Sequence, residues 1–130
     1  MSAKIDEALE RARRRLARVE AAEAAEEVSH GALLVDTRTE TQRRRDGEIP
    51  NAMVIDRTVL EWRLDPTSPS RIPEASGPEI RVILICNEGY SSSLAAASLQ
   101  DLGLVNATDV IGGFQAWREA GLPVADEPRA

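Results

Sequence analysis

Four short, uninterrupted apolar runs most strongly limit what this chain can fold into. The third run, Arg81-Val-Ile-Leu-Ile-Cys86, is the most apolar of them. Runs of this length are typical of parallel strands that are buried on both faces. The four runs are residues 32–36, 52–56, 81–86 and 108–111. Helical stretches are expected between some of them, at residues 39–45, 92–102 and 114–120. Strands that alternate with helices indicate an α/β domain with a mostly parallel sheet.

The rest of the chain divides into flanking parts and one long connection. Apolar residues at helical spacing from Lys4 to about Arg18 predict an amphipathic helix, and residues 21–28 predict a second one. Val19, between these helices, is a candidate for a very short strand. Residues 64–78 hold four of the seven prolines and are expected to form a long surface loop. We therefore expect an N-terminal helix over residues 1–17, one domain over 18–125 and a tail over 126–130.

Composition excludes several classes of protein. The chain has one cysteine and one histidine, which excludes an internal disulfide and makes a zinc site implausible, so no metal is predicted. Its 16 basic and 22 acidic residues give a net charge of −6, which disfavours nucleic-acid binding. No apolar run is long enough to cross a membrane, and the N-terminus lacks the apolar region of a secretory signal. These features predict a cytoplasmic protein that does not bind membranes.

The single cysteine lies where a parallel sheet places its ligands. Cys86 ends the most apolar run, and a loop with glycine at its centre follows, leading into the helix that begins near Ser92. Ligands of such sheets lie beyond the carboxyl ends of the strands. The free N–H groups of the loop and of the helix N-terminus favour a thiolate, which is the nucleophilic form of cysteine. The predicted site is Cys86 with an anion-binding loop of Asn87, Glu88, Gly89, Tyr90, Ser91 and Ser92. The hydroxyls of Ser92 and Ser93 are expected to cap the helix.

This loop and three further segments resemble the rhodanese family of sulfurtransferases. The segment Leu34-Val-Asp-Thr-Arg38 resembles the family's Val-Asp-x-Arg strand end, and Gly47-Glu-Ile-Pro-Asn-Ala52 resembles its Gly-His-Ile-Pro-Gly-Ala turn. Gly112-Gly-Phe-Gln-Ala-Trp117, followed by Ala120-Gly-Leu-Pro-Val124, resembles its closing motif. The resemblance covers roughly residues 18–125 and leaves the first helix outside.

The resemblance implies a three-layer α/β domain with a central, mostly parallel sheet of five strands, here with an extra N-terminal helix. It also implies that Cys86 takes sulfane sulfur from a small-molecule donor as a persulfide. The sulfur then passes to a thiol or another nucleophilic acceptor. No cofactor is required for this chemistry.

Two residues depart from the family pattern. Ser91 stands where many active members carry an arginine that holds an anionic donor, and Glu88 adds a negative charge to the loop. Thiosulfate is therefore expected to be a poor donor. Arg57 and Arg63 follow the second strand and are candidate replacements, while Asp36 and Arg38 are expected to form a structural ion pair. The alternative function is a non-catalytic binding or regulatory module on the same fold.

Overall fold

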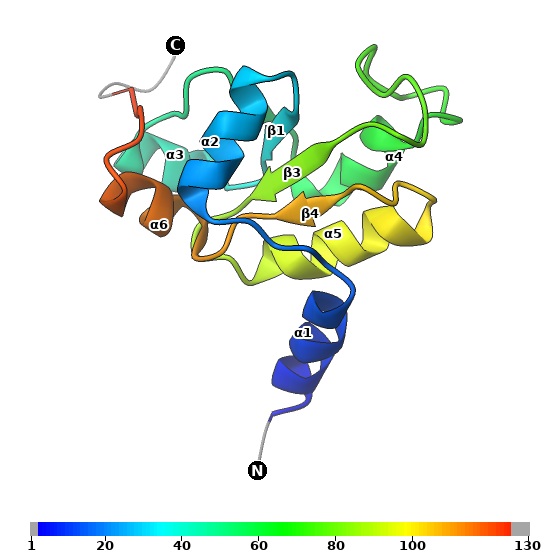
Figure 1. Cartoon of the computed structure of the whole chain (residues 1–130), viewed down its shortest axis with the longest axis horizontal. Coiled ribbons are helices and arrows are strands. Elements are labelled where there is room, and N and C mark those ends of the chain that lie inside the picture. Colours follow the sequence, from blue (N-terminus) through cyan, green and yellow to red (C-terminus); the bar gives the residue numbers. More distant parts are fainter. Residues whose placement is uncertain (1–2, 126–130) are drawn as a thin grey trace.

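The computed structural model describes residues 3–125, so the tail expected at 126–130 lies outside the described part. The chain forms an α/β domain in which helices cover both faces of one sheet (Figure 1). None of the helices in the described part is both long and apolar enough to cross a bilayer.

The sheet is parallel throughout and has the strand order β2-β1-β3-β4. Its strands are β1 (Leu33–Asp36), β2 (Met53–Val54), β3 (Val82–Ile85) and β4 (Thr108–Asp109). The predicted count of five strands is wrong by one. In place of a fifth strand, Val19 forms a single parallel bridge with Val110. The first helix ends at Arg14 and the second begins at Ala21, so the short connection between them leaves room for little more than this bridge.

The helices other than the first lie on the two faces of the sheet. The helices are α1 (Lys4–Arg14), α2 (Ala21–Ser29), α3 (Glu40–Asp46), α4 (Leu60–Leu64), α5 (Ser91–Asp101) and α6 (Gly113–Glu119), with a 3₁₀ turn, η1, at Arg57–Val59. Successive side chains of β3 point to opposite faces. Ile83 and Ile85 join the core cluster that contains residues of α2 and α6, and Val82 and Leu84 join the cluster that contains residues of α4 and α5. A strand buried on both faces explains why this run is apolar throughout.

Local sequence signals set several helix boundaries. Helix α2 begins with a capping box between Glu20 and Glu23, although no such cap was expected there. Thr39 and Gln42 form the capping box of α3, and this helix ends at Asp46, just before Gly47, whose φ of +98° favours glycine.

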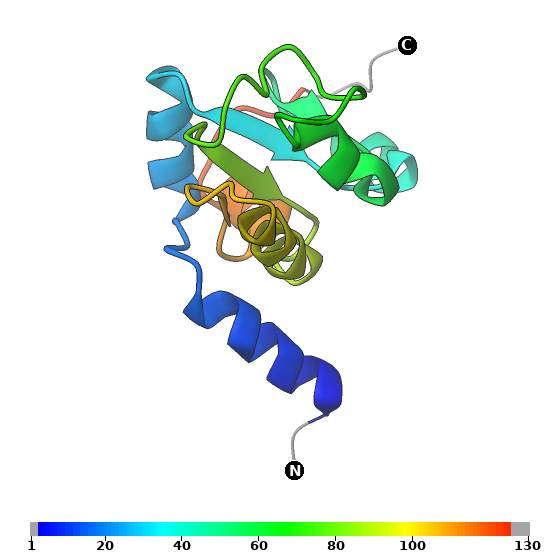
Figure 2. The same cartoon turned by 90° about the vertical axis from the view of Figure 1, so that its right-hand side faces the viewer.

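Helix α1 packs against α5 and points away from the body of the domain (Figure 2). It ends at Arg14 rather than near Arg18, because the backbone of the next residues extends to bring Val19 against β4. The N–H of Val19 donates to the carbonyl of Asp109 at 3.1 Å, and the N–H of Ile111 donates back to Val19 at 2.9 Å.

The long connection between α4 and β3 is irregular, as expected, but it is only partly a surface loop. Ile72 and Ala75 are buried in the core cluster shared by α4 and α5. The N–H of Ile72 also donates to the carbonyl of Arg63 at 2.8 Å, which ties the loop to α4. Two apolar residues among prolines and serines carry no periodic pattern, which is why the sequence did not reveal their burial.

The central strand supplies a test of the core. Leu84 is 0% exposed, and Leu84→Ala should lower the free energy of unfolding by about 2–5 kcal/mol through lost burial and a cavity. The matched change Leu102→Ala, at a side chain that is 42% exposed, should cost no more than about 1 kcal/mol. Urea denaturation of both variants measures the difference, and equal losses would contradict this assignment of the core.

Candidate functional site

Cys86 directly follows β3, at the edge of the sheet where the parallel strands end. Asp36 at the end of β1 and Asp109 at the end of β4 lie at the same edge. The cysteine residue is 4% exposed, so its thiol is largely enclosed by the structure that follows it.

The loop after Cys86 turns backbone N–H groups toward the sulfur. The N–H of Gly89 lies 3.1 Å from Cys86 Sγ and that of Ser92 lies 3.4 Å away. Gly89 has a φ of +85°, a conformation that glycine adopts readily and that aims its N–H inward. Two of the expected N–H groups, one from the loop and one from the first turn of α5, therefore reach the sulfur. Such donors stabilise negative charge on sulfur.

The Gly112–Gly113 turn packs directly on this loop. The carbonyl of Cys86 accepts the N–H of Phe114 at 2.8 Å, and the carbonyl of Asn87 accepts that of Gln115 at 3.2 Å. A Cβ added at Gly113 would lie 2.5 Å from the Cys86 carbonyl oxygen and 2.7 Å from the Gly89 nitrogen. Gly113 therefore has to lack a side chain for the loop to keep its shape.

A cavity of about 340 Å³ opens beside Cys86. Its walls contain seven of the residues predicted from sequence and three others that follow β1; the full set is Thr37, Arg38, Thr39, Gln42, Arg57, Cys86, Asn87, Glu88, Tyr90 and Ser91. Thr37, Thr39 and Gln42 were missed, although the rule that parallel strands end at one edge points to the connection after β1. Within residues 3–125, no three His, Cys, Asp or Glu side chains are grouped so that they could hold a metal ion.

Of the two candidate arginines, Arg57 reaches the cavity and Arg63 does not. Arg63 instead donates to the carbonyl of Ser70 at 2.8 Å. The guanidinium of Arg57 is held by both oxygens of Glu61, at 2.9 and 3.0 Å. Burial raises the pKa of Glu61, but hydrogen bonds from Ser98, from backbone and from Arg57 outweigh it and leave that pKa below its ordinary value. Glu61 is thus ionised at neutral pH and offsets the charge of Arg57.

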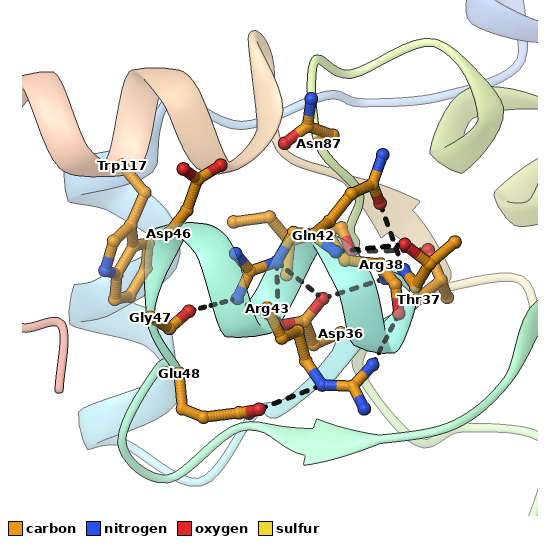
Figure 3. Close-up of polar contacts among 12 residues, drawn as sticks. Asp36, Thr37, Arg38, Gln42, Arg43, Asp46, Gly47, Glu48, Asn87 and Trp117 are labelled. Atoms are coloured by element: carbon orange, nitrogen blue, oxygen red, sulfur yellow. Dashed lines mark hydrogen bonds and ion pairs between the residues drawn. The ribbon is translucent and has the colours of Figure 1, made fainter. Parts of the chain in front are cut away.

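Asp36 and Arg38 form the expected ion pair (Figure 3), and Arg38 also lines the cavity. Arg38 Nη2 lies 2.8 Å from Asp36 Oδ2 and 2.9 Å from the carbonyl of Gly47. The guanidinium also stacks 3.9 Å from the centre of the Phe114 ring. Only its Nη1 lacks a hydrogen-bond partner within the described residues. The pair joins the end of β1 to the turn after α3.

Asp109 is a part of the site that sequence analysis missed. Its buried carboxylate pairs with Arg18 at 2.8 Å and accepts hydrogen bonds from the hydroxyls of Ser92 and Ser93 at 2.7 and 2.8 Å. The expectation that these serines cap the helix is wrong, because their side chains turn toward this carboxylate. Oγ of Ser92 also lies 3.1 Å from Cys86 Sγ.

Two arginines from the N-terminal segment hold the outer side of the loop. Arg13 and Arg18 both donate to the carbonyl of Gly89, at 2.7 and 3.1 Å. The guanidinium of Arg13 also lies over the ring of Tyr90, 5.7 Å from its centre. Because Gly89 supplies one of the N–H groups at the sulfur, α1 and the connection after it are part of the site.

A parallel α/β sheet with a cysteine held in an N–H-lined loop at the end of its central strand defines a recognisable class of domain. The sequence pattern of the rhodanese-like domain matches residues 20–120 of this chain. The chain therefore belongs to the rhodanese-like family.

Two relatives that are named sulfurtransferases agree with this assignment. A sulfurtransferase of Allochromatium vinosum is 34% identical over 92 residues, which span 71% of this chain and 77% of that protein. The thiosulfate sulfurtransferase GlpE of Actinobacillus succinogenes is 49% identical over 43 residues, but these span only 33% of this chain and 39% of that protein. A solved structure from Rhodopseudomonas palustris, described as a protein of unknown function and possible tyrosine phosphatase, has a TM-score of 0.85, 31% identity and 96% coverage of both chains.

The contact between the Gly112–Gly113 turn and the loop can be tested with a matched pair of variants. Gly113→Ala and Gly103→Ala both place a side chain at positive φ, +57° and +93°, which should destabilise the fold by about 1–2 kcal/mol at Gly103 and by more at Gly113, where the Cβ also meets backbone atoms of the loop. Only Gly113→Ala also forces atoms into the Cys86 loop, because nothing lies within 4 Å of a Cβ at Gly103. Gly113→Ala should therefore change the rate at which iodoacetamide alkylates Cys86, whereas Gly103→Ala should not. Equal alkylation rates in the two variants would contradict the proposal that this turn holds the Cys86 loop in place.

Proposed function

We propose that this protein is a sulfurtransferase in which Cys86 carries sulfane sulfur as a persulfide. The observation that carries the proposal is the pair of N–H groups, from Gly89 and Ser92, directed at a cysteine beside an open cavity. The names of the Allochromatium and Actinobacillus relatives support the same class of reaction.

Two displacements at sulfur make up the reaction. The Cys86 thiolate attacks the outer sulfur of the donor, the donor's own sulfur bond breaks, and its leaving group departs with the electron pair. An acceptor nucleophile then attacks the outer sulfur of the Cys86 persulfide and releases the thiolate. Both steps place negative charge on sulfur, where fixed N–H donors stabilise it without rearranging. No external oxidant or reductant is consumed, and a cytoplasmic location would supply thiol acceptors.

The charges around the cavity favour a persulfide or uncharged donor over thiosulfate. Ser91 offers no cation, Glu88 contributes a negative charge, and the charge of Arg57 is offset by Glu61. The same features argue against the phosphatase activity suggested for the Rhodopseudomonas protein, because tetrahedral oxyanions are usually clamped by a cation. They are also the observations that favour the second candidate function, a binding or regulatory module that does not turn over sulfur.

Mass spectrometry separates the two candidates directly. After incubation with a persulfide donor and removal of excess reagent, the intact protein should gain about 32 Da, one sulfur atom, and an added thiol should remove it. Cys86→Ser should show no gain, since the chain has no other cysteine. An unmodified protein after exposure to persulfide, thiosulfate and 3-mercaptopyruvate would support the binding module instead.

Donor choice can be tested at position 91. Ser91→Arg should raise kcat/KM for thiosulfate about ten- to a hundredfold, because one charge-assisted contact is worth about 1.5–3 kcal/mol in the transition state. Arg57→Gln should lower it by less than this, since Arg57 is partly exposed and already paired. The matched change Arg63→Gln should have no effect, because Arg63 lies outside the cavity. If Ser91→Arg leaves thiosulfate turnover unchanged, charge is not what limits the use of this donor.

A further inference from the structure

The hydroxyl of Ser92 lies between the sulfur of Cys86 and the carboxylate of Asp109. Its oxygen is 2.7 Å from Asp109 Oδ2 and 3.1 Å from Cys86 Sγ. All three residues are buried, so water does not compete for these contacts. A serine hydroxyl has a single proton to donate, and its position decides how the oxygen acts toward the sulfur.

The Asp109 carboxylate pairs with Arg18, and a carboxylate in an ion pair only accepts hydrogen bonds, so the short contact from Ser92 is charge-assisted. The Ser92 proton therefore points at Asp109, and the oxygen presents lone pairs to the sulfur. A thiol satisfies these lone pairs by donating its S–H, whereas a thiolate would be repelled by them. We infer that Asp109 is a positioning residue that acts through Ser92 to hold unloaded Cys86 as a hydrogen-bonded thiol.

Arg18 and Ser93 keep this arrangement in place. Arg18 donates to both oxygens of Asp109, at 2.8 and 3.2 Å, which fixes the plane of the carboxylate. Ser93 shares Asp109 Oδ2 with Ser92 but makes no hydrogen bond to the sulfur. Ser93 therefore provides a natural control, since it contacts the same carboxylate without touching the cysteine.

Other groups around the sulfur also affect whether Cys86 is a thiol or a thiolate. The N–H groups of Gly89 and Ser92 favour the thiolate. The Gly112–Gly113 turn carries no charged side chain, and α1 contributes Arg13, which reaches Ser93 at 3.2 Å. The charged or titratable side chains that face the cavity at Cys86 are Arg38, Arg57, Glu88 and Tyr90.

This arrangement has a consequence for sulfur transfer, which rests on the proposed function. In a Cys86 persulfide the inner sulfur carries no proton and the negative charge lies on the outer sulfur, one bond farther from Ser92. The lone pairs of Ser92 then oppose the charge less. The network would protect the unloaded cysteine from oxidation or alkylation while leaving the loaded form stable.

The inference is tested by the pH dependence of Cys86 alkylation, which does not depend on sulfur transfer. In this reaction the thiol loses its proton to solvent and the thiolate displaces iodide from iodoacetamide. Asp109→Asn removes the charge and frees the Ser92 proton to turn toward sulfur. The midpoint of the pH–rate profile should fall by about one pH unit. Ser92→Ala should also lower it, and Ser93→Ala, which removes a contact to the same carboxylate and to the Gly89 carbonyl but none to the sulfur, should move it less.

The double variant Asp109→Asn/Ser92→Ala separates a path through Ser92 from a charge effect through space. In the Ser92→Ala background, Asp109→Asn should move the midpoint much less than the same substitution moves it in the native chain. An equal movement in both backgrounds would overturn the inference, as would an unchanged midpoint in folded Asp109→Asn. If circular dichroism shows that Asp109→Asn does not fold, the midpoints of Ser92→Ala and Ser93→Ala are compared instead. Equal midpoints for these two variants would overturn the inference. A protein that shows these shifts but takes up no sulfur would count against the proposed function only.

Discussion

The hydrogen bonds from the Gly89 and Ser92 backbone to the Cys86 sulfur are the interaction on which the site depends. They require a loop that curls tightly and stays in place. The Gly112–Gly113 turn supports one side of this loop, and there is no space for a Cβ at Gly113. Arg13 and Arg18 hold the other side through the Gly89 carbonyl. The loop is therefore a rigid part of the fold, and its N–H donors need little rearrangement to stabilise charge on sulfur.

In the proposed sulfur transfer, the surroundings of the loop would decide which donors it accepts. Arg57 reaches the cavity but is paired with Glu61, and Glu88 lies in the wall. Ser91 leaves the position of the usual loop cation uncharged. We expect a cavity of this kind to hold tetrahedral oxyanions weakly, whereas a persulfide donor would need mainly the N–H groups at the cysteine. Family membership and a preference for thiosulfate are thus separate properties, as expected when one fold serves several functions.

Features encoded by local sequence were predicted well, and features that depend on distant residues were not. The apolar runs revealed all four strands, and the position of Cys86 after the third run revealed the loop. The pair of Arg18 and Asp109 joins residues 91 positions apart, and no local pattern connects them. The Val19 bridge and the burial of Ile72 likewise depend on tertiary packing. Sequence alone could not exclude Arg63 from the site, because the direction of its side chain depends on where α4 begins. The boundaries of helices are predicted poorly from sequence.

The most direct test of the central claim is a crystal structure of the protein after exposure to a persulfide donor. The account predicts one additional sulfur bonded to Cys86 Sγ, extending into the cavity bounded by Thr37, Arg57 and Tyr90, with the Gly89 and Ser92 N–H groups still directed at the cysteine. A cysteine that remains unmodified under conditions that load other rhodanese-like domains would contradict the account. A sulfur bound with the loop opened and its N–H groups turned away would contradict the role assigned to the loop.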